Sequence, residues 1–572
     1  MKPSQLLIAF LISFNLFGQS WPWGFRGGAV DDTSNAPETV LSLQTDSQKN
    51  IYALARVGYA GIFLGNQLIQ PNGDAITKND VVLFSLNCTG ELRWYKVFGG
   101  RSEERVGQLA IDENDNIYFA GTVSSCAPVG DINGPAAFFG EFDFNNTLEA
   151  CSRSILAKIN SDGDFIWIRR PQPFLSQSEA QGTVNVDLLR DETGTLHWFM
   201  SMRSGTFCDG QYTVPQGGSK HHILKYDTDG NFVQGISLNM SIDILPLPKF
   251  YRNPNNGHYF FTNYRDPENV VSFNGTPITG TGYLASYDQN GNFLWVRQTT
   301  SANEVSAMIP HGLDFDSNNN IYLGGVLGNL TGSNSFLGFA IPPEQFQRTF
   351  VLKCNPTAET VIWAHHNNKF GQLTGTTKII NDELYWASNG VTTVTWSGQS
   401  FTVATTSNSR HFAAKFNLET GACTGGFWIP STQGGFNYFN DITQDASGDL
   451  ILGGQFTGSV NLDNNQTLTQ SGGSSDFIIA KYAAQACSPL NTNDLPFEQV
   501  QLYPNPVKDV FVLQVAQTAK YQIISLNGTI IKNGTANQGS NSIQVSELPP
   551  GIHLLKLIFE NSEIEIRKLL KN

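Results

Sequence analysis

One polar turn motif recurs seven times along the chain, and its spacing limits the possible folds more than any other feature. Each copy joins two strand-like runs, as in Asp46-Ser-Gln-Lys-Asn-Ile51-Tyr and Asp112-Glu-Asn-Asp-Asn-Ile117-Tyr. The second strands begin at positions 51, 117, 196, 258, 321, 384 and 450, so the intervals are 66, 79, 62, 63, 63 and 66 residues. A sheet of about this size cannot bury both faces alone, whereas repeated sheets bury them by stacking radially. The repeat therefore predicts an all-β propeller.

The second half of each unit repeats as well. A strand that ends near a lysine leads through a Gly-containing turn to a strand with Trp, as in residues 155–167. Glycine suits such a hairpin turn because it tolerates positive φ. The seventh unit stops after Lys481 without a Trp strand, but Trp23 stands near the N-terminus, where no complete unit precedes it. We therefore expect this N-terminal strand to pair with the last unit and close a seven-bladed ring over residues 21–487.

The turn and the Trp strand together resemble a known bacterial repeat. Asp445-Ala-Ser-Gly-Asp-Leu450 is similar to its "DxxGNIY" piece, and Lys158, Gly163 and Trp167 match the Lys, Gly and Trp of its "FxxKxxxxGxxxW" piece, with Ile155 in place of the Phe. On these residues the body of the chain resembles the SBBP-type β-propeller repeat. The resemblance implies a propeller fold and little about function.

Composition agrees with an all-β chain and excludes some function classes. Charged residues make up 15% of the sequence, aromatic residues 12%, and glycine is abundant at 55 residues. Such a chain is poor in charged helix formers and rich in strand and turn formers. The net charge of -14, without clusters of Lys or Arg, argues against nucleic acid as a partner.

The seven cysteines are too few for a disulfide scaffold and include no CxxC pair. Cys126 and Cys151 bracket the extra residues that lengthen the second interval to 79. We predict a disulfide between them that staples this insertion; two buried free cysteines are the alternative. The odd number leaves at least one thiol free or intermolecular.

The N-terminus reads as an export signal. Lys2 precedes an apolar run of about a dozen residues, and small or polar residues follow it up to Ser20. This order is typical of a secretory signal peptide, here residues 1–20. The run is shorter than the roughly 20 residues that span a bilayer, and no later segment reaches that length, so no transmembrane helix is predicted.

The C-terminus has a different character. After a polar linker at residues 488–499, seven short alternating runs predict a small β-sandwich at residues 500–572. Their motifs stand in a fixed order: Tyr503-Pro504-Asn505-Pro506, then Asn527-Gly528, then the Gly551 strand, then Lys568. This order resembles the type A C-terminal sorting domain of the type IX secretion system, except that His553 stands where the family usually has Tyr. The resemblance implies a surface or secreted protein that meets the type IX machinery, crosses the outer membrane and often loses this domain afterwards.

Three groups of residues invite a chemical interpretation. The loops that begin at Asp227 and Asn160 resemble calcium loops, but Leu238 and Pro171 stand where a bidentate Glu is needed, and turn chemistry explains them without metal. Five lysines share one repeat position and form either a cationic ring for an anionic ligand or a ladder paired with carboxylates. They are Lys158, Lys225, Lys353, Lys415 and Lys481.

The pairs His221-His222 and His365-His366 could suggest a metal, but neighbouring strand residues point to opposite faces. His365 stands two places after Trp363, where Arg169 and Arg297 follow their own tryptophans. No metal or cofactor site is assigned on these grounds, and no catalytic residue either, because the common catalytic motifs are missing.

Two functions remain open. The first is a non-catalytic surface or secreted propeller, a monomer, that binds a glycan or protein or has a structural role. The second is an exported glycosidase or peptidase with its site on one propeller face. A deep pocket that holds two close carboxylates would favour the second, because glycosidases need such a pair.

Overall fold

The structure is a computed structural model of the whole chain. It describes residues 19–31, 37–58, 60–69, 80–99, 104–124, 138–140, 142–143, 152–171, 183–218, 220–242, 248–266, 268–300, 308–327, 334–337, 339–341, 348–368, 375–403, 409–433, 435–484, 487, 500–503, 506–515, 517–525, 529–559 and 564–571. All regular elements in these ranges are strands. The chain divides into two compact units, Met1–Cys487 and Ser488–Asn572.

The first unit consists of small antiparallel sheets built from consecutive strands. Four sheets have four strands each in the same spatial order. They are β15 (Thr183–Arg190), β16 (Leu196–Met202), β19 (His221–Tyr226) and β20 (Phe232–Leu238); β22 (Lys249–Arg252), β23 (Tyr259–Tyr264), β26 (Gly282–Tyr287) and β27 (Phe293–Gln298); β28 (Met308–Phe315), β29 (Ile321–Leu327), β32 (Arg348–Cys354) and β33 (Val361–His366); and β34 (Thr376–Ile380), β35 (Glu383–Val391), β38 (Ser409–Asn417) and β39 (Cys423–Trp428).

Two earlier sheets follow the same plan with additions. They are β2 (Thr39–Thr45), β3 (Ile51–Val57), β6 (Asp80–Leu86) and β7 (Leu92–Gly99), extended by β11 (Phe138–Phe139) and β12 (Phe142–Asp143); and β8 (Arg105–Val106), β9 (Ala110–Ile111), β10 (Ile117–Ser124), β13 (Ser152–Ile159) and β14 (Phe165–Arg169).

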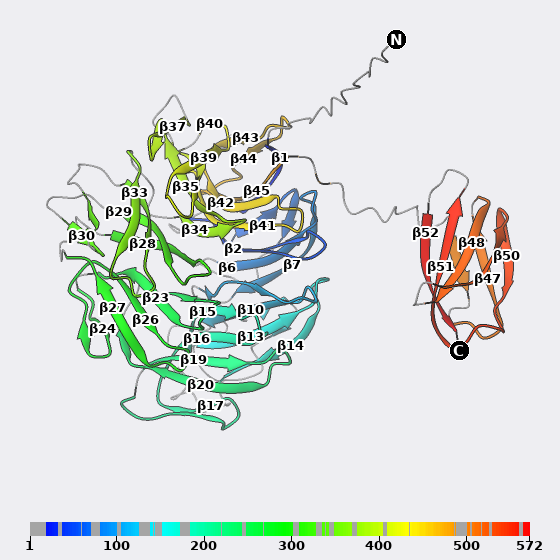
Figure 1. Cartoon of the computed structure of the whole chain (residues 1–572), viewed down its shortest axis with the longest axis horizontal. Helices are drawn as coiled ribbons and strands as arrows, with labels where there is room; N and C mark the ends of the chain where they lie inside the picture. Colours follow the sequence, from blue (N-terminus) through cyan, green and yellow to red (C-terminus); the bar gives the residue numbers. More distant parts are fainter. Residues whose placement is uncertain are drawn as a thin grey trace, which may run out of the picture. The chain divides into compact units, whose positions relative to one another are not determined.

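The last sheet of this unit combines the two ends of its sequence. It contains β41 (Tyr438–Gln444), β42 (Leu450–Phe456), β45 (Asp476–Ala483), β1 (Ser20–Asp31), β4 (Ala60–Leu64) and β5 (Gln67–Ile69). β1 runs antiparallel to β45, with Trp23 opposite Lys481 and Phe25 opposite Ile479. In Figure 1 the sheets follow one another around the unit from blue through green to yellow, and β45 lies beside the blue β1. The arrangement is propeller-like.

Short hairpins lie between the main strands. They are β17 (Gly205–Phe207) with β18 (Tyr212–Val214); β21 (Met240–Ile242) with β24 (Val271–Phe273) and β25 (Thr276–Pro277); β30 (Asn334–Phe336) with β31 (Phe339–Ile341); β36 (Thr393–Trp396) with β37 (Gln399–Thr402); and β40 (Ser431–Gln433) with β43 (Ser459–Asn461) and β44 (Thr467–Thr469).

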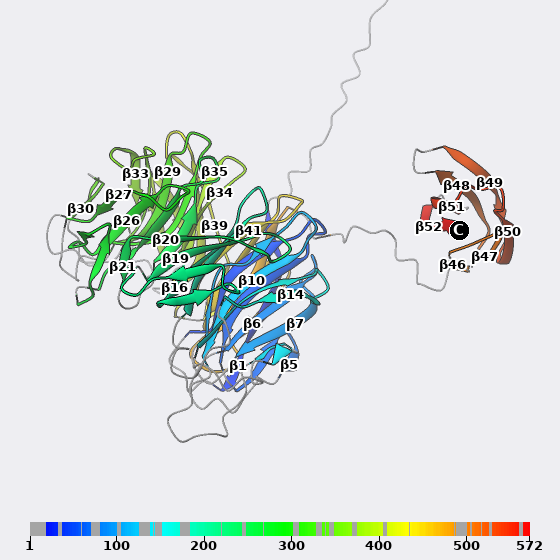
Figure 2. The ribbon, with the colours of Figure 1, turned by 90° about the horizontal axis from the view of Figure 1, so that it is seen from below.

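The apolar core of the first unit lies between neighbouring sheets. One cluster joins Leu54 and Leu83 of one sheet to Phe119 and Ile155 of the next. Further clusters lie between each following pair of sheets. The cluster that contains Phe477 joins β45 to β2, β3 and β6. Each sheet therefore buries both faces against its neighbours, as the repeat requires; Figure 2 shows the sheets from a second direction.

The repeated tryptophans connect one sheet to the next. Trp94 Nε1 donates a hydrogen bond to Ser161 O at 2.8 Å, and Trp363 Nε1 donates to Leu418 O at 3.1 Å, each in the turn of the following unit. Gly163 in the first of these turns has φ +93°, and a Cβ there would lie 2.8 Å from the Trp94 ring. Glycine is thus required for both the turn and the close approach of the indole.

The second unit has its own core. Its described strands are β46 (Val500–Tyr503), β47 (Val510–Val515), β48 (Ala519–Ser525), β49 (Ile530–Ala536), β50 (Gly539–Gln544), β51 (Gly551–Phe559) and β52 (Ile564–Lys571). They form two sheets, in the orders β46-β47-β50 and β49-β48-β51-β52. Phe511 from the first sheet and Leu555 from the second belong to one buried cluster.

Candidate functional site

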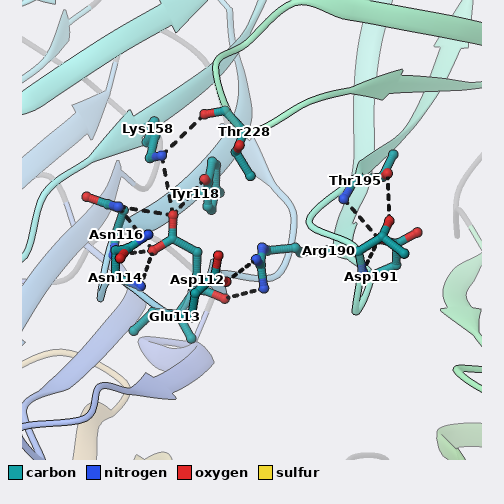
Figure 3. Close-up of polar contacts among 12 residues, drawn as sticks. Asp112, Glu113, Asn114, Asn116, Tyr118, Lys158, Arg190, Asp191, Thr195 and Thr228 are labelled. Atoms are coloured by element: carbon teal, nitrogen blue, oxygen red, sulfur yellow. Dashed lines mark hydrogen bonds and ion pairs between the residues drawn. The ribbon is translucent and has the colours of Figure 1, made fainter.

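Four of the five repeated lysines pair with a carboxylate in or beside the polar turn of their own sheet. Lys158 Nζ lies 3.3 Å from Asp112 Oδ2 and also donates to Thr228 O in the following unit (Figure 3). Lys353 and Lys481 pair in the same way with Asp316 and Asp445. Lys415 pairs with Glu383, and Lys225 donates to Gln289 O. These lysines form a structural ladder, and the alternative of a cationic ring for a ligand is not supported.

The turn aspartates organise their own loops. Asp112 Oδ1 accepts hydrogen bonds from the backbone amides of Asn114 and Asn116, and Tyr118 Oη donates to Asp112 Oδ2 at 2.9 Å (Figure 3). These hydrogen bonds hold the pKa of Asp112 below its ordinary value although burial opposes them. The carboxylate therefore stays ionised and serves the turn.

The calcium-like loops contain the same turn. Asp227 Oδ1 accepts from the amides of Asp229 and Asn231, and Asn160 Oδ1 accepts from those of Asp162 and Asp164. Turn hydrogen bonds therefore account for Asp227 and Asn160 without a metal. In the described ranges no group of three or more His, Cys, Asp or Glu residues could hold a metal ion.

The paired histidines separate as strand geometry requires. His222 Nδ1 lies 2.8 Å from Tyr212 Oη, whereas the His221 ring packs near Phe199. His365 stacks on Trp363 with ring centroids 5.8 Å apart. Arg169 and Arg297 lie over their own tryptophans in the same way. His365 is thus a variant of a repeated stacking position.

The cysteines include a pairing that sequence reasoning missed. Cys88, in the turn between β6 and β7, forms a disulfide with Cys487, which follows β45 and lies 399 residues further on. Trp23 Nε1 donates to Cys88 O, so the disulfide lies where β1 meets the next sheet. Cys208, Cys354 and Cys423 are buried free thiols. The predicted partners Cys126 and Cys151 lie outside the described residues.

The sorting-motif residues fall on the strands of the second unit where they are described. Tyr503 ends β46 opposite Val512, Gly551 begins β51 with φ +136°, and Lys568 lies opposite Leu554 on β52. His553 is buried, and its Nε2 lies 2.9 Å from Pro549 O, to which it donates. Pro506 is exposed, whereas Pro504, Asn505 and Gly528 lie outside the described residues, as do the predicted linker 488–499 and residues 1–18 of the predicted signal.

A cavity of about 540 Å³ lies among the first strands of the sheets. Residues of β2, β8, β15, β22, β28, β34 and β41 line it, and we call it the inner-strand cavity. Its charged lining residues are Arg56, Glu104, Arg105, Asp187, Lys249, Asp314, Lys378 and Asp441. The repeat motifs recognised in the sequence do not include these residues.

Three aspartates of the inner-strand cavity join neighbouring sheets. Asp441 Oδ2 accepts from Leu43 N at 2.7 Å, and Asp314 Oδ2 accepts from Ile379 N at 2.7 Å. Asp187 Oδ1 accepts from Gln108 N at 2.8 Å. Each aspartate also accepts from the amide of the residue that follows it. Burial raises the pKa of all three, and these hydrogen bonds oppose the rise.

The cations of the cavity are bound less tightly. Lys249 Nζ donates to His311 O, and burial lowers the pKa of Lys249 to about 8 although Asp187 and Asp441 oppose this. The side chains of Arg56, Arg105 and Lys378 make no hydrogen bond or ion pair within the described part of the chain. Asn185 is 1% exposed; its Oδ1 accepts from Trp198, and its Nδ2 has no partner there.

Comparison with known proteins identifies the C-terminal unit. Residues 501–572 match the model of the secretion system C-terminal sorting domain. This match identifies the chain as a cargo of the type IX secretion system, exported to the cell surface or secreted. Its sorting tail implies interaction with the type IX machinery. No helix of the described residues is long and apolar enough to cross a membrane. A search of curated proteins finds no match.

The chain is similar to several solved structures, one of which is described as a propeller. The Dos1 propeller is 9% identical, with 82% of this chain and 95% of that chain covered and a TM-score of 0.35. The quinohemoprotein alcohol dehydrogenase from Comamonas testosteroni is 10% identical, with coverage of 86% and 79% and a TM-score of 0.34. PorZ, a surface component of the type IX secretion system of Porphyromonas gingivalis, is 9% identical, with coverage of 94% and 99% and a TM-score of 0.21.

Proposed function

We propose that residues 21–487 form a closed seven-bladed β-propeller of SBBP-type repeats in which β1 is the fourth strand of the last blade. Three observations support this closure. β1 pairs with β45, the core cluster of Phe477 joins the last sheet to the first, and Trp23 donates to Cys88 O as Trp94 donates to Ser161 O. Residues 1–20 are then the signal peptide, 488–499 the linker and 500–572 an Ig-like sorting domain. The protein acts as a monomer.

The function that we propose is non-catalytic binding or adhesion at the cell surface or beyond it, after passage across the outer membrane. The inner-strand cavity is the binding site, because it is a concave space lined by both charged and apolar side chains, of a volume that suits a small ligand. The hydrogen bonding of its aspartates is the observation that carries this proposal. Each carboxylate accepts hydrogen bonds from two backbone amides, one of them from a neighbouring sheet.

This bonding favours binding over hydrolysis. A hydrolase of the glycosidase type needs one carboxyl group that exchanges a proton and a second that attacks or activates water. Asp187, Asp314 and Asp441 instead serve the same structural purpose, since each fastens one inner strand to the next. Loss of such a carboxylate would loosen the ring.

A parallel test of binding and hydrolysis decides between the two functions. The exported protein is screened against immobilised glycans and host-matrix proteins, and the same preparation is incubated with polysaccharide and peptide substrates. We expect binding without turnover. Absence of any binding in the screen, or turnover that disappears in Asp187→Asn while the fold is retained, would overturn the proposed function.

A further inference from the structure

In the inner-strand cavity three acidic side chains already have hydrogen-bond partners, whereas three basic side chains have none among the described residues. Three of its carboxylates already accept backbone amides from their own and neighbouring strands. The guanidinium groups of Arg56 and Arg105 and the ammonium group of Lys378 donate no hydrogen bond to any acceptor in the described part of the chain. Among these six groups the unused hydrogen-bonding capacity is therefore that of donors.

These donors come from separate places around the cavity. Arg56 lies on β3 and Arg105 on β8, in successive sheets, whereas Lys378 lies on β34, the first strand of another sheet. The buried Asn185 adds an unpartnered amide nitrogen from β15. Lys378 interacts electrostatically with Asp314 and Asp441 but makes no hydrogen bond to them. Partly buried cations that lack a hydrogen-bond partner are unfavourable, so an acceptor between these groups would stabilise them.

We propose that the inner-strand cavity binds a small anionic molecule through Arg56, Arg105 and Lys378. The ligand carries a carboxylate, sulfate or phosphate group and is about the size of a monosaccharide or disaccharide, which a cavity of about 540 Å³ accommodates. A sugar acid and a sulfated or phosphorylated sugar share the required chemistry. This inference rests on the proposed binding role and specifies its ligand class.

The balance of formal charge determines how such a ligand is recognised. The lining contains four cations, Arg56, Arg105, Lys249 and Lys378, and four acids, Glu104, Asp187, Asp314 and Asp441. A cavity without net formal charge exerts little long-range attraction on an anion. Recognition therefore depends on short charge-assisted hydrogen bonds, which give specificity for planar or tetrahedral oxyanions.

Calorimetric titration of the exported full-length protein tests this proposal. The probes are D-glucuronate, glucose 6-sulfate and glucose 6-phosphate, with neutral D-glucose as the matched control and inorganic sulfate and phosphate as separate arms. We expect at least one charged sugar to bind about tenfold or more tightly than glucose, as a charge-assisted hydrogen bond allows. The three sugar arms distinguish carboxylate, sulfate and phosphate as the preferred group, and the inorganic arms show whether the anion alone suffices.

Variants locate the binding. Lys378→Met and Arg105→Gln should each lower the affinity for the preferred probe about tenfold or more. Arg203→Gln, at an exposed residue outside the cavity, should leave this affinity unchanged. Thermal unfolding of wild type with each probe supplies a readout that does not depend on the folding of the variants. Equal affinity for glucose and the charged sugars, no response to any probe, or tight binding unaffected by Lys378→Met would overturn the inference. Binding of a neutral glycan would then leave the proposed binding function standing, whereas hydrolysis of a substrate would remove it.

Discussion

Lys481 Nζ lies 2.6 Å from Asp445 Oδ2, and each of these two side chains is about 1% exposed. The lysine also lies 2.9 Å from Asp449 Oδ2, so it ties β45 to the polar turn before β42. Removal of the ammonium group would leave two carboxylates without their cation, one of them fully buried. We expect Lys481→Met to lower the free energy of unfolding by about 3–5 kcal/mol, measured by chemical denaturation.

The chain contains a matched control at the same repeat position. Lys415 lies 2.9 Å from Glu383, but the two side chains are 34% and 30% exposed. Water screens this pair, so Lys415→Met should lower the free energy of unfolding by about 1 kcal/mol or less. Equal losses for the two variants would show that burial does not determine the strength of this ladder.

The Cys88–Cys487 disulfide is expected to stabilise the first unit. It joins the turn between β6 and β7 to the residue that follows the last sheet, across 399 residues of sequence. We expect Cys88→Ser with Cys487→Ser to lower the free energy of unfolding by about 2–4 kcal/mol, since the link restricts the unfolded chain. A reductant should destabilise the wild type by a similar amount. Unchanged unfolding of the double variant would contradict this expectation.

Peptide mapping without reduction tests the second disulfide that we predict. Two linked peptides are expected, one with Cys88 and Cys487 and one with Cys126 and Cys151. The remaining cysteines, Cys208, Cys354 and Cys423, are buried and should react with an alkylating reagent only after denaturation. Burial also raises the pKa of Cys208 to about 11, which lowers its reactivity further. Free Cys126 and Cys151 in the map would refute the predicted staple.

Much of the repeated architecture could be predicted from the sequence, because many of the repeated residues contact others that are close to them in the sequence. The turn at Asp112 is built from hydrogen bonds within six residues, and Gly163 is required by its own turn. The predicted strand starts were correct at Ile51 and Ile117. They differed by one residue near His258 and Leu384, where β23 begins at Tyr259 and β35 at Glu383.

The site could not be predicted in the same way. Asp187, Asp314 and Asp441 each depend on a hydrogen bond to the neighbouring sheet, and no local pattern encodes that contact. Asp187 and Asp441 also follow bulges in their strand pairs, which shift the alternation of faces. The Cys88–Cys487 pairing was missed for a similar reason, because only the folded unit brings these residues together.

His411 is expected to make stability depend on pH. It is buried beside Phe439, its Nε2 donates to Gln455 O at 2.9 Å, and burial lowers the pKa of His411 to about 3. The unfolded chain binds a proton at this histidine below pH 6.5 and the folded chain does not. The contribution of neutral His411 to the free energy of unfolding is therefore complete above about pH 6.5. It is lost as the pH falls toward 3, by at most about 1.4 kcal/mol per pH unit.

The variant His411→Gln isolates this contribution. The difference in free energy of unfolding between wild type and variant should shrink as the pH falls from 6.5 toward 3, because only the unfolded wild type gains a proton at residue 411. The carboxylates titrate in both proteins, so their effect cancels. Chemical denaturation at several pH values measures it. A difference that stays constant over this range would contradict a neutral buried histidine.

Deletion of residues 500–572 should stop export at the outer membrane without unfolding the first unit. The core of the sorting domain contains only residues of the second unit, and the clusters of Trp21 and Phe477 contain only residues of the first. We therefore expect the truncated protein to unfold with the cooperative transition of the first unit but to accumulate in the periplasm, since its sorting tail is gone. Cell fractionation with protease accessibility measures its location, and thermal unfolding measures its integrity. Residues 500–572 fused to a periplasmic reporter serve as the converse control and should bring the reporter to the surface. Normal surface delivery of the truncated protein would show that another part of the chain carries the address.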